Sequence, residues 1–363
     1  MHIHNLTPLL GISLLTLGCA AKALDLDAPV IEASNEPDVL GTLQELVTKI
    51  VVDDERVYWL GYGRTLKKFV QSCQKQDCAA TLITYDAQSD IEERTLAVRA
   101  GQLYWYRSSA AELLSCPRAG CSGAPRSVAR MLVDSTSGPW TNAFDDDRFY
   151  FTNLDVRTTI SSVSLTQPGP AQAVASTKPA LLVGLDDAHA YWVTWAADGG
   201  YDAELSRARK DGSSSVSEVI ATDVKLGAFD QFAFGTDRTG IYWTNNQLAG
   251  SINRCPTAGC TGASESITGP VRAPQKLLID GSDLYYAYET QSGRLGLATC
   301  ELPACAQSTR LTLTEKLFTP ELLALDDQYL YVATSEQDRR FRDSATEVSM
   351  NIRRLPKRGG AEQ

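Results

Sequence analysis

The sequence predicts an all-β protein, a seven-bladed β-propeller with four-stranded blades and hairpin disulfides. Three observations lead to this fold class: a strand unit that recurs seven times, large side chains on both faces of the recurring strand, and cysteine pairs at one fixed place in the unit. Six or eight blades, and a β-sandwich with irregular strands, are the alternatives. A sandwich does not predict so regular a repeat.

The recurring unit is centred on a Tyr that is usually followed by a second aromatic residue. Successive anchor tyrosines are 41 to 51 residues apart. A period of this size indicates tandem units that bury a core only by stacking on one another. The seven anchors are Tyr58, Tyr104, Tyr150, Tyr191, Tyr242, Tyr285 and Tyr331.

The anchor strand carries large apolar side chains on both of its faces. In the first unit Val57 and Trp59 lie on one face and Tyr58 on the other. A strand with one wet face would alternate apolar and polar residues. Both faces are therefore expected to be buried, as when blades pack around an axis.

Eight of the nine cysteines form four pairs, and the two members of each pair are five residues apart. The first Cys lies 12 to 15 residues after its anchor Tyr, which places every pair on the hairpin after the third strand. Opposed residues on a hairpin have Cα atoms ~4.5–5.5 Å apart, within disulfide reach. Zinc binding, the alternative, would require two pairs to converge. We expect local, individually dispensable disulfides at Cys73–Cys78, Cys116–Cys121, Cys255–Cys260 and Cys300–Cys305.

Bulk composition narrows the function classes. The 363-residue chain has 43% hydrophobic and 21% charged residues, as ordinary globular proteins do. Its net charge of −10 argues against a nucleic-acid partner, which requires a basic face. His2 and His4 lie in the predicted signal peptide, so His189 alone would remain, and a multi-histidine zinc site is excluded.

The N-terminus has the features of an export signal. The apolar stretch 6–17 is too short to span a bilayer but suits a signal peptide. Gly18-Cys19-Ala20 resembles the lipobox of bacterial lipoproteins, in which the Cys is acylated; ordinary signal cleavage is the alternative. We predict a signal peptide over 1–18, and an acylated Cys19 followed by a tether over 19–45. The residue after the Cys is Ala20. An Asp at that position often signals retention in the inner membrane, so Ala20 favours the outer membrane.

We expect a single propeller domain over 46–360. The seventh unit ends before a fourth strand could form. The hypothesis is that residues 29–33, within the tether, supply that strand beside residues 350–356 and so close the ring.

Several motifs resemble known propeller repeats. The strings IYWTN (241–245) and FYFTN (149–153), with the preceding acidic turns, are similar to the YWTD repeat of low-density-lipoprotein-receptor-type propellers. They also resemble exported bacterial repeat lipoproteins whose units carry VYWTN and a Cys-Pro-x-x-Gly-Cys hairpin. The resemblance covers about residues 46–360, although YWTD propellers have six blades. It implies binding or scaffolding and transfers no ligand.

Acidic runs recur at the first turn of several units, at 53–54, 145–147, 186–187 and 326–327. Because Asp side chains bond nearby backbone amides, this position predicts structural turns rather than calcium ligands. No nucleophile elbow, phosphate loop or dinucleotide fingerprint is present in the sequence. We predict no catalytic residue, no metal site and no cofactor.

Variable segments between the second and third strands would share one face of the disc. Exposed aromatic and Arg side chains are enriched in binding hot spots. The candidates on this face are Trp195, Tyr201, Arg339, Arg340 and Arg342; the alternative is that they are solvated loop residues.

These observations favour a monomeric, non-enzymatic cell-envelope lipoprotein whose propeller binds or scaffolds an envelope protein or glycan. It would contact the membrane only through its lipid anchor. One alternative is a metal-dependent propeller hydrolase or lyase, which would need three or more carboxylates or amides converging in the channel. The other is a purely structural or adhesive surface protein.

Overall fold

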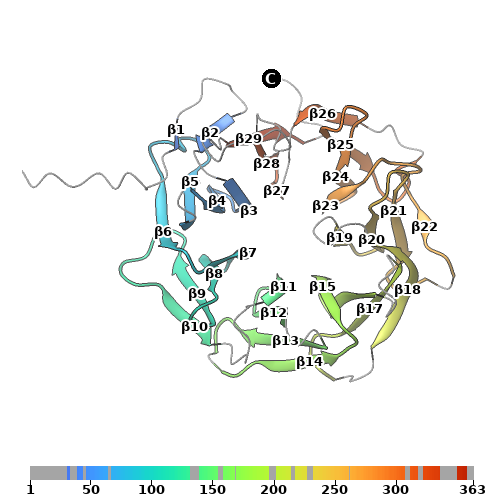
Figure 1. Ribbon diagram of the computed structural model, residues 1–363, viewed down its shortest axis with the longest axis horizontal. Coiled ribbons are helices and arrows are strands. Elements are labelled where there is room, and N and C mark those ends of the chain that lie inside the picture. Colours follow the sequence, from blue (N-terminus) through green and yellow to red (C-terminus); the bar gives the residue numbers. More distant parts are fainter. Residues whose placement is uncertain are drawn as a thin grey trace, which may run out of the picture.

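Seven antiparallel sheets stand around a central axis in the computed structural model (Figure 1). The structure describes residues 31–32, 39–43, 46–63, 67–130, 139–153, 158–167, 169–195, 202–213, 217–226, 232–260, 262–306, 311–317, 322–335 and 350–357. Throughout these ranges the regular secondary structure is strand, and no helix long and apolar enough to cross a membrane occurs in them. The prediction of a seven-bladed, all-β propeller is confirmed.

Each of blades 1 to 6 contains four strands in chain order across the sheet. The bounds are, for blade 1, β3 (Leu46–Val52), β4 (Arg56–Tyr62), β5 (Lys68–Gln74) and β6 (Ile83–Gln88); for blade 2, β7 (Ile91–Arg99), β8 (Gln102–Arg107), β9 (Glu112–Pro117) and β10 (Arg126–Arg130); for blade 3, β11 (Pro139–Phe144), β12 (Arg148–Asn153), β13 (Thr159–Ser164) and β14 (Gln172–Ser176).

The remaining strands continue the same pattern. They are, for blade 4, β15 (Ala180–Leu185), β16 (His189–Trp195), β17 (Asp202–Arg209) and β18 (Glu218–Lys225); for blade 5, β19 (Phe234–Thr236), β20 (Gly240–Asn245), β21 (Ser251–Pro256) and β22 (Glu265–Ser266); for blade 6, β23 (Gln275–Asp280), β24 (Asp283–Glu289), β25 (Leu295–Glu301) and β26 (Leu311–Leu317); and for blade 7, β27 (Leu322–Leu325), β28 (Tyr329–Ser335), β29 (Met350–Pro356), β2 (Val39–Leu43) and β1 (Ile31–Glu32).

Blade 7 closes the ring with strands from both ends of the described chain. The order of its strands from the axis outward is β27, β28, β29, β2 and β1. The predicted closing segment is therefore displaced: Val39–Leu43 pairs with β29, whereas Ile31–Glu32 lies one strand farther out, against β2. Closure by an N-terminal strand is confirmed, but its position was wrong, and the propeller sheet begins before residue 46.

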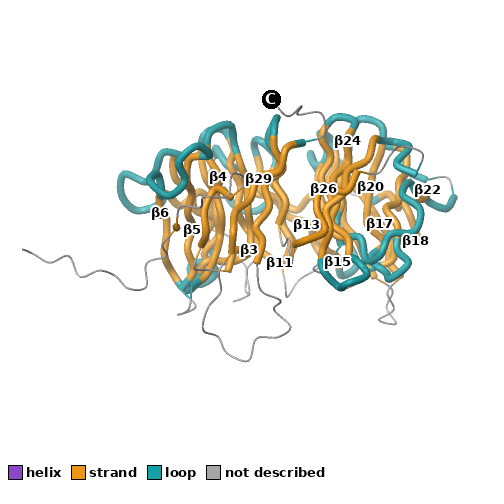
Figure 2. The backbone as a smooth tube through the Cα atoms, turned by 90° about the horizontal axis from the view of Figure 1, so that it is seen from above, coloured by secondary structure: helices purple, strands orange, loops and turns teal. Residues whose placement is uncertain are grey.

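The strands cross the thickness of the disc, so the connections lie on two opposite faces (Figure 2). The turn from the first to the second strand of a blade and the hairpin from the third to the fourth share one face, because the strands alternate in direction. We call this the turn face. The connections between second and third strands lie on the other face, which we call the loop face.

The hydrophobic core is divided among the junctions between blades. Within the described residues seven buried clusters occur, and each joins one anchor Tyr to the second-strand residues of the next blade. Tyr58 of blade 1 packs with Trp105 of blade 2, and Tyr331 of blade 7 packs with Trp59 of blade 1. Large side chains on both strand faces are therefore explained by a neighbour on each side.

Small residues let the innermost strands approach one another near the axis. A Cβ on Gly184 in blade 4 would lie 2.4 Å from the ring of Phe234 in blade 5, and one on Gly235 would lie 2.5 Å from Leu277 in blade 6. Contacts this short do not occur between real atoms, so these positions require glycine.

Candidate functional site

The turn face is built from a repeated Asp–Tyr unit. Asp lies five residues before the anchor Tyr in six of the seven blades. In five of them, one carboxylate oxygen accepts hydrogen bonds from the amides two and three residues later, at 2.6–3.0 Å. The structural interpretation of the acidic runs is confirmed. The five residues are Asp53, Asp145, Asp186, Asp237 and Asp326.

The other carboxylate oxygen of this Asp accepts a hydrogen bond from the anchor Tyr hydroxyl. The O–O distances are 2.7 Å for Tyr58, 2.5 Å for Tyr191, 3.1 Å for Tyr242 and 2.6 Å for Tyr331. The first turns of blades 2 and 6 lack this unit. They contain Gly101 and Gly281 at φ 73° and 57°, a left-handed conformation that glycine adopts without strain.

A cation from the next blade binds the same acidic turns. Lys75, Arg118, Lys210 and Lys357 occupy one position of the repeat, two residues after the first Cys of the hairpin or its counterpart. Their side chains pair with the preceding blades: Lys75 with Asp326, Arg118 with Asp54 at 2.6 Å, Lys210 with Asp145 at 2.8 Å, and Lys357 with Asp280. We call this arrangement the cation clamp.

Sequence reasoning missed the cation clamp because it treated each hairpin as a local structure. The amide of the clamp residue bonds the turn of its own blade, for example Lys75 N to Glu55 O at 3.0 Å and Lys210 N to Ala188 O at 2.8 Å. This bond fixes the backbone and directs the side chain to the neighbour. The four cations lie 17, 14, 19 and 26 residues after their anchor Tyr, so spacing in the sequence does not align them, and only the strand register brings them to one position.

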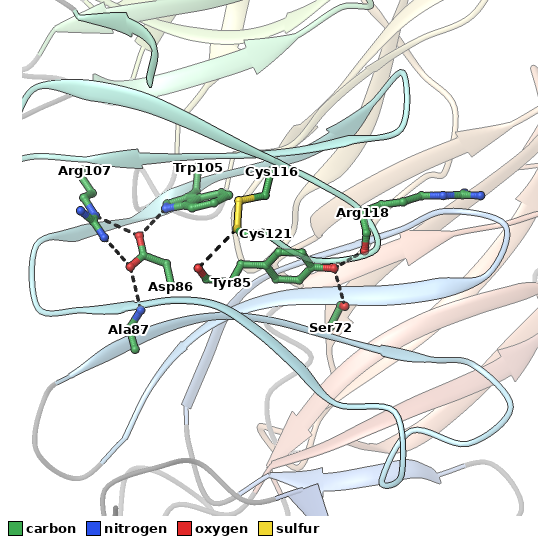
Figure 3. The surroundings of a disulfide bond; sticks show 9 residues. All are labelled: Ser72, Tyr85, Asp86, Ala87, Trp105, Arg107, Cys116, Arg118 and Cys121. Carbon is green, nitrogen blue, oxygen red and sulfur yellow. Dashed lines mark hydrogen bonds and ion pairs between the residues drawn. A yellow bond between two sulfur atoms is a disulfide. The ribbon is translucent and has the colours of Figure 1, made fainter. Parts of the chain in front are cut away.

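The four predicted disulfides are present. Their Cα–Cα distances are 4.6–5.2 Å, within the range expected for opposed hairpin residues. The hairpins are less local than expected, because they also dock on the preceding blade. Figure 3 shows Tyr85 of β6 beside the Cys116–Cys121 bond, with its hydroxyl donating to Arg118 O. In blade 5, Cys260 N donates to Ile220 O of blade 4 at 3.2 Å.

An ion pair between the buried Asp86 and the partly exposed Arg107 joins blades 1 and 2 beside this disulfide (Figure 3). Asp86 of β6 accepts a hydrogen bond from Trp105 Nε1 at 2.7 Å and two from Arg107, at 2.6 and 3.0 Å. Asp86 holds the pKa of Arg107 above its ordinary value, mainly through this side-chain hydrogen bond. The network has a structural role at the junction.

The turn face is hollowed at the junction between blades 7 and 1. The cleft has a volume of about 730 Å³. Five carboxylates and two cations line it: Asp53, Asp54, Glu55, Asp326 and Asp327, with Lys75 and Arg354. Asp53 and Asp326 are held by their turns, whereas the side chains of Asp54 and Glu55 are 71% and 61% exposed. Asp327 is also exposed.

Electrostatics keep the inner groups of the cleft in fixed protonation states. Burial opposes ionisation of Asp326, but hydrogen bonds from Lys75, Tyr331 and the turn amides lower its pKa to about 2. Burial and the adjacent Asp326 raise the pKa of Tyr331 well above its usual range. General acid–base catalysis works best with a pKa near the ambient pH. These groups therefore suit the binding of cations rather than proton transfer.

The predicted binding residues are placed only in part. Trp195 ends β16, where its backbone lies opposite Ala203, but its side chain is outside the described part. Tyr201, Arg339, Arg340 and Arg342 lie outside the described residues, as does Cys19. Among the described side chains, no group of three or more His, Cys, Asp or Glu is arranged to hold a metal ion.

Comparison with known proteins shows the propeller fold. Neither a protein-family profile nor a curated protein sequence matches the chain. A puromycin-hydrolysing peptidase from Mycobacterium tuberculosis is 11% identical, with a TM-score of 0.58 over 80% of this chain and 49% of that one. The β-propeller domain of the Trilobed protease from Pyrococcus furiosus, described as an open velcro topology, is 7% identical, with a TM-score of 0.55 over 80% and 91%.

A nidogen/laminin complex is also similar, at 16% identity and a TM-score of 0.44 over 68% of this chain and 89% of that one. The chain spans about half the length of the peptidase chain from M. tuberculosis. At these identities the likeness concerns the fold alone.

Proposed function

We propose that this protein is an exported, lipid-anchored propeller that binds or scaffolds a partner in the cell envelope and catalyses no reaction. The acidic cleft between blades 7 and 1 carries the proposal. It combines a concave site with exposed carboxylates on a rigid frame, which favours a protein partner with exposed Lys or Arg side chains over a neutral glycan.

The proposed location has two supports. The disulfides indicate an oxidising compartment outside the cytosol. Cys19 follows an apolar stretch and is the one Cys outside the four pairs. The motifs that resemble YWTD propellers and bacterial repeat lipoproteins agree with an exported binding protein.

Partner capture tests the binding site. The tagged full chain, in mild detergent, is used to enrich proteins from envelope extracts at low salt. Asp54→Asn with Asp327→Asn is expected to reduce the captured partner at least tenfold, because both carboxylates face the cleft. The matched control, Asp146→Asn with Asp147→Asn, makes the same charge change on the turn of blade 3 and should retain capture.

A further variant separates the two faces of the disc. Trp195→Ala with Arg340→Ala alters the loop face predicted from sequence and leaves the cleft intact. Loss of capture in this variant alone would move the binding site to the loop face. Capture that survives both pairs of substitutions would place the binding site on neither surface, and a wild-type chain that captures no partner would favour a purely structural or adhesive role.

The lipid anchor is tested separately. Metabolic labelling with a palmitate analogue should mark the wild-type chain and not Cys19→Ser, which should also leave the membrane fraction. A labelled Cys19→Ser chain would refute the anchor and leave the cleft proposal untouched.

A further inference from the structure

Three blades carry an arginine directly opposite the anchor Tyr on the third strand. These residues are Arg207 in blade 4, Arg254 in blade 5 and Arg354 in blade 7. Directly opposed residues on neighbouring strands have their side chains on the same face of the sheet. Each arginine therefore points, like its anchor Tyr, toward the junction with the next blade.

In blades 4 and 5 the fourth strand supplies a carboxylate that holds this arginine. Arg207 pairs with Glu218, which lies opposite it on β18, at 2.9 Å. Arg254 pairs with Glu265, which lies opposite it on β22, at 3.6 Å. Each guanidinium also donates to a main-chain carbonyl. Both arginines thus serve the fold of their own junctions.

The arginine of blade 7 is held differently in the part of the chain that the structure describes. The fourth strand here is β2, and its residues Val39–Leu43 include no acidic side chain. The Arg354 guanidinium instead lies 5.2 Å from the ring centroid of Tyr329. Both residues line the cleft between blades 7 and 1. The aromatic ring supports the guanidinium and leaves its N–H groups able to bind a carboxylate that enters the cleft.

The cleft therefore presents charges of both signs to a ligand. Asp327 is exposed on the turn of blade 7, and the Asp54 side chain is 71% exposed on the turn of blade 1. Arg354 is half-buried, so a ligand group must enter the cleft to reach it. A cleft of about 730 Å³ is large enough to hold such a group together with its neighbours.

We propose that Arg354 recognises a Glu side chain of the protein partner, while the exposed carboxylates of the cleft bind Lys side chains on either side of that Glu. The proposal rests on the proposed function, because it names the chemistry of the segment that enters the cleft. A guanidinium binds a carboxylate through two parallel hydrogen bonds. A Glu side chain carries its carboxylate away from the main chain, so it can reach Arg354 while the Lys residues stay near the exposed carboxylates.

Two short peptides measure this preference. Isothermal titration calorimetry of the full chain in detergent, at low salt, compares Lys-Glu-Lys with Lys-Gln-Lys, both N-acetylated and C-amidated. A cleft that is simply acidic should prefer the Gln peptide, because that peptide has the larger positive charge. Arg354 should reverse this order, so that wild type binds the Glu peptide about tenfold more tightly than the Gln peptide.

Removal of the guanidinium should restore the order expected from charge. Arg354→Gln should bind the Glu peptide about tenfold more weakly than wild type does, and the Gln peptide at least as tightly. A misfolded chain would lose both peptides, so a reversed preference reports on Arg354 itself. The matched control, Arg254→Gln, removes the arginine at the same position of blade 5, outside the cleft, and should keep the wild-type preference.

The outcomes separate this proposal from the acidic cleft. A wild-type chain that prefers the Gln peptide, or an Arg354→Gln chain that still prefers the Glu peptide, would overturn the role of Arg354 and leave the cleft proposal standing. A wild-type chain that binds neither peptide would overturn both. If Lys-Gln-Lys with a free C-terminus binds as tightly as the Glu peptide, the assignment to a Glu side chain is wrong.

Discussion

At the scale of residues, the hydroxyl of the anchor Tyr explains the use of Tyr rather than Phe in the blades whose first turn carries the Asp–Tyr unit. In blade 7 the Tyr331 hydroxyl donates to Asp326, which is fixed by two turn amides and paired with Lys75. A ring buried between two blades thus ends in a polar atom that organises the turn above it. The Tyr of the motif therefore contributes a hydrogen bond as well as a hydrophobic contact.

Removal of one hydroxyl tests this interpretation. Tyr331→Phe should lower the free energy of unfolding by about 1 kcal/mol, because Asp326 loses a short hydrogen bond while the ring contacts remain. Urea denaturation measures the change. Tyr104→Phe is the matched control, since Arg99 replaces Asp at its turn. Equal losses in the two variants would contradict the role of the Asp–Tyr bond.

The same units predict how stability responds to acid. Hydrogen bonds outweigh burial and lower the pKa values of Asp53, Asp145 and Asp186, and that of Asp326 to about 2. An Asp in the unfolded chain titrates near pH 4. The contribution of these groups is therefore complete above about pH 4 and is lost as the pH falls toward 2.

Thermal unfolding between pH 2 and pH 7 measures this dependence. Wild type should lose Tm steeply below pH 4, and Asp326→Asn should show a shallower decline over the same interval. Parallel curves would mean that Asp326 is not part of the acid response.

At the scale of elements, the disulfide hairpins connect each blade to the one before it through non-covalent contacts. The hairpin of blade 2 carries Arg118 onto the turn of blade 1 and receives the hydroxyl of Tyr85 from β6. The disulfide closes a short loop, so it removes little conformational entropy from the unfolded chain. Its larger effect is to hold Arg118 where its side chain can reach the turn of blade 1.

Cys116→Ala with Cys121→Ala should therefore cost more than closure of a short loop, which contributes about 2 kcal/mol. We expect a loss of about 2–4 kcal/mol, with blade 1 destabilised as well, and retention of the β circular-dichroism signal. Hydrogen exchange should show faster amide exchange in β6 as well as in β9 and β10. Faster exchange confined to blade 2 would mean that the disulfide stabilises only its own hairpin.

At the scale of the whole molecule, one non-covalent seam decides whether the ring is closed. Leu43 of β2 is 1% exposed and packs in the cluster that joins blades 7 and 1. Its register partner is Met350 of β29. The seam therefore depends on contacts between the two ends of the described chain.

Leu43→Ala should lower the free energy of unfolding by about 2–4 kcal/mol, as expected for truncation of a buried Leu. The effect should reach across blade 7, with faster amide exchange in β29. Val219→Ala, at a side chain 51% exposed in β18, is the control and should change stability little. A separate unfolding transition of wild type at low denaturant would show that blade 7 unfolds independently of the ring.

The sequence predicted the features of the fold that depend on residues close together in the chain. The spacing of the anchors gave the number of blades, and the Cys spacing gave the disulfides, because both arise within one repeat. The closing strand was misplaced because Val39–Leu43 pairs with a segment about 310 residues away, through contacts such as Thr42 to Asn351. The cation clamps were missed for a related reason: Lys75 and Lys210 look like ordinary hairpin cations until their neighbours are placed beside them.

The placement of β2 beside β29 has a consequence for the order in which the protein forms. Thr42 and Asn351 are 309 positions apart, so β2 cannot pair with β29 until the six intervening blades have been synthesised. Blades 1 to 6 can assemble in succession from adjacent hairpins, whereas the final blade requires a loop spanning the whole domain, which is entropically slow. Until then the outer edge of β29 stays unpaired, and an open strand edge is a template for pairing with other chains.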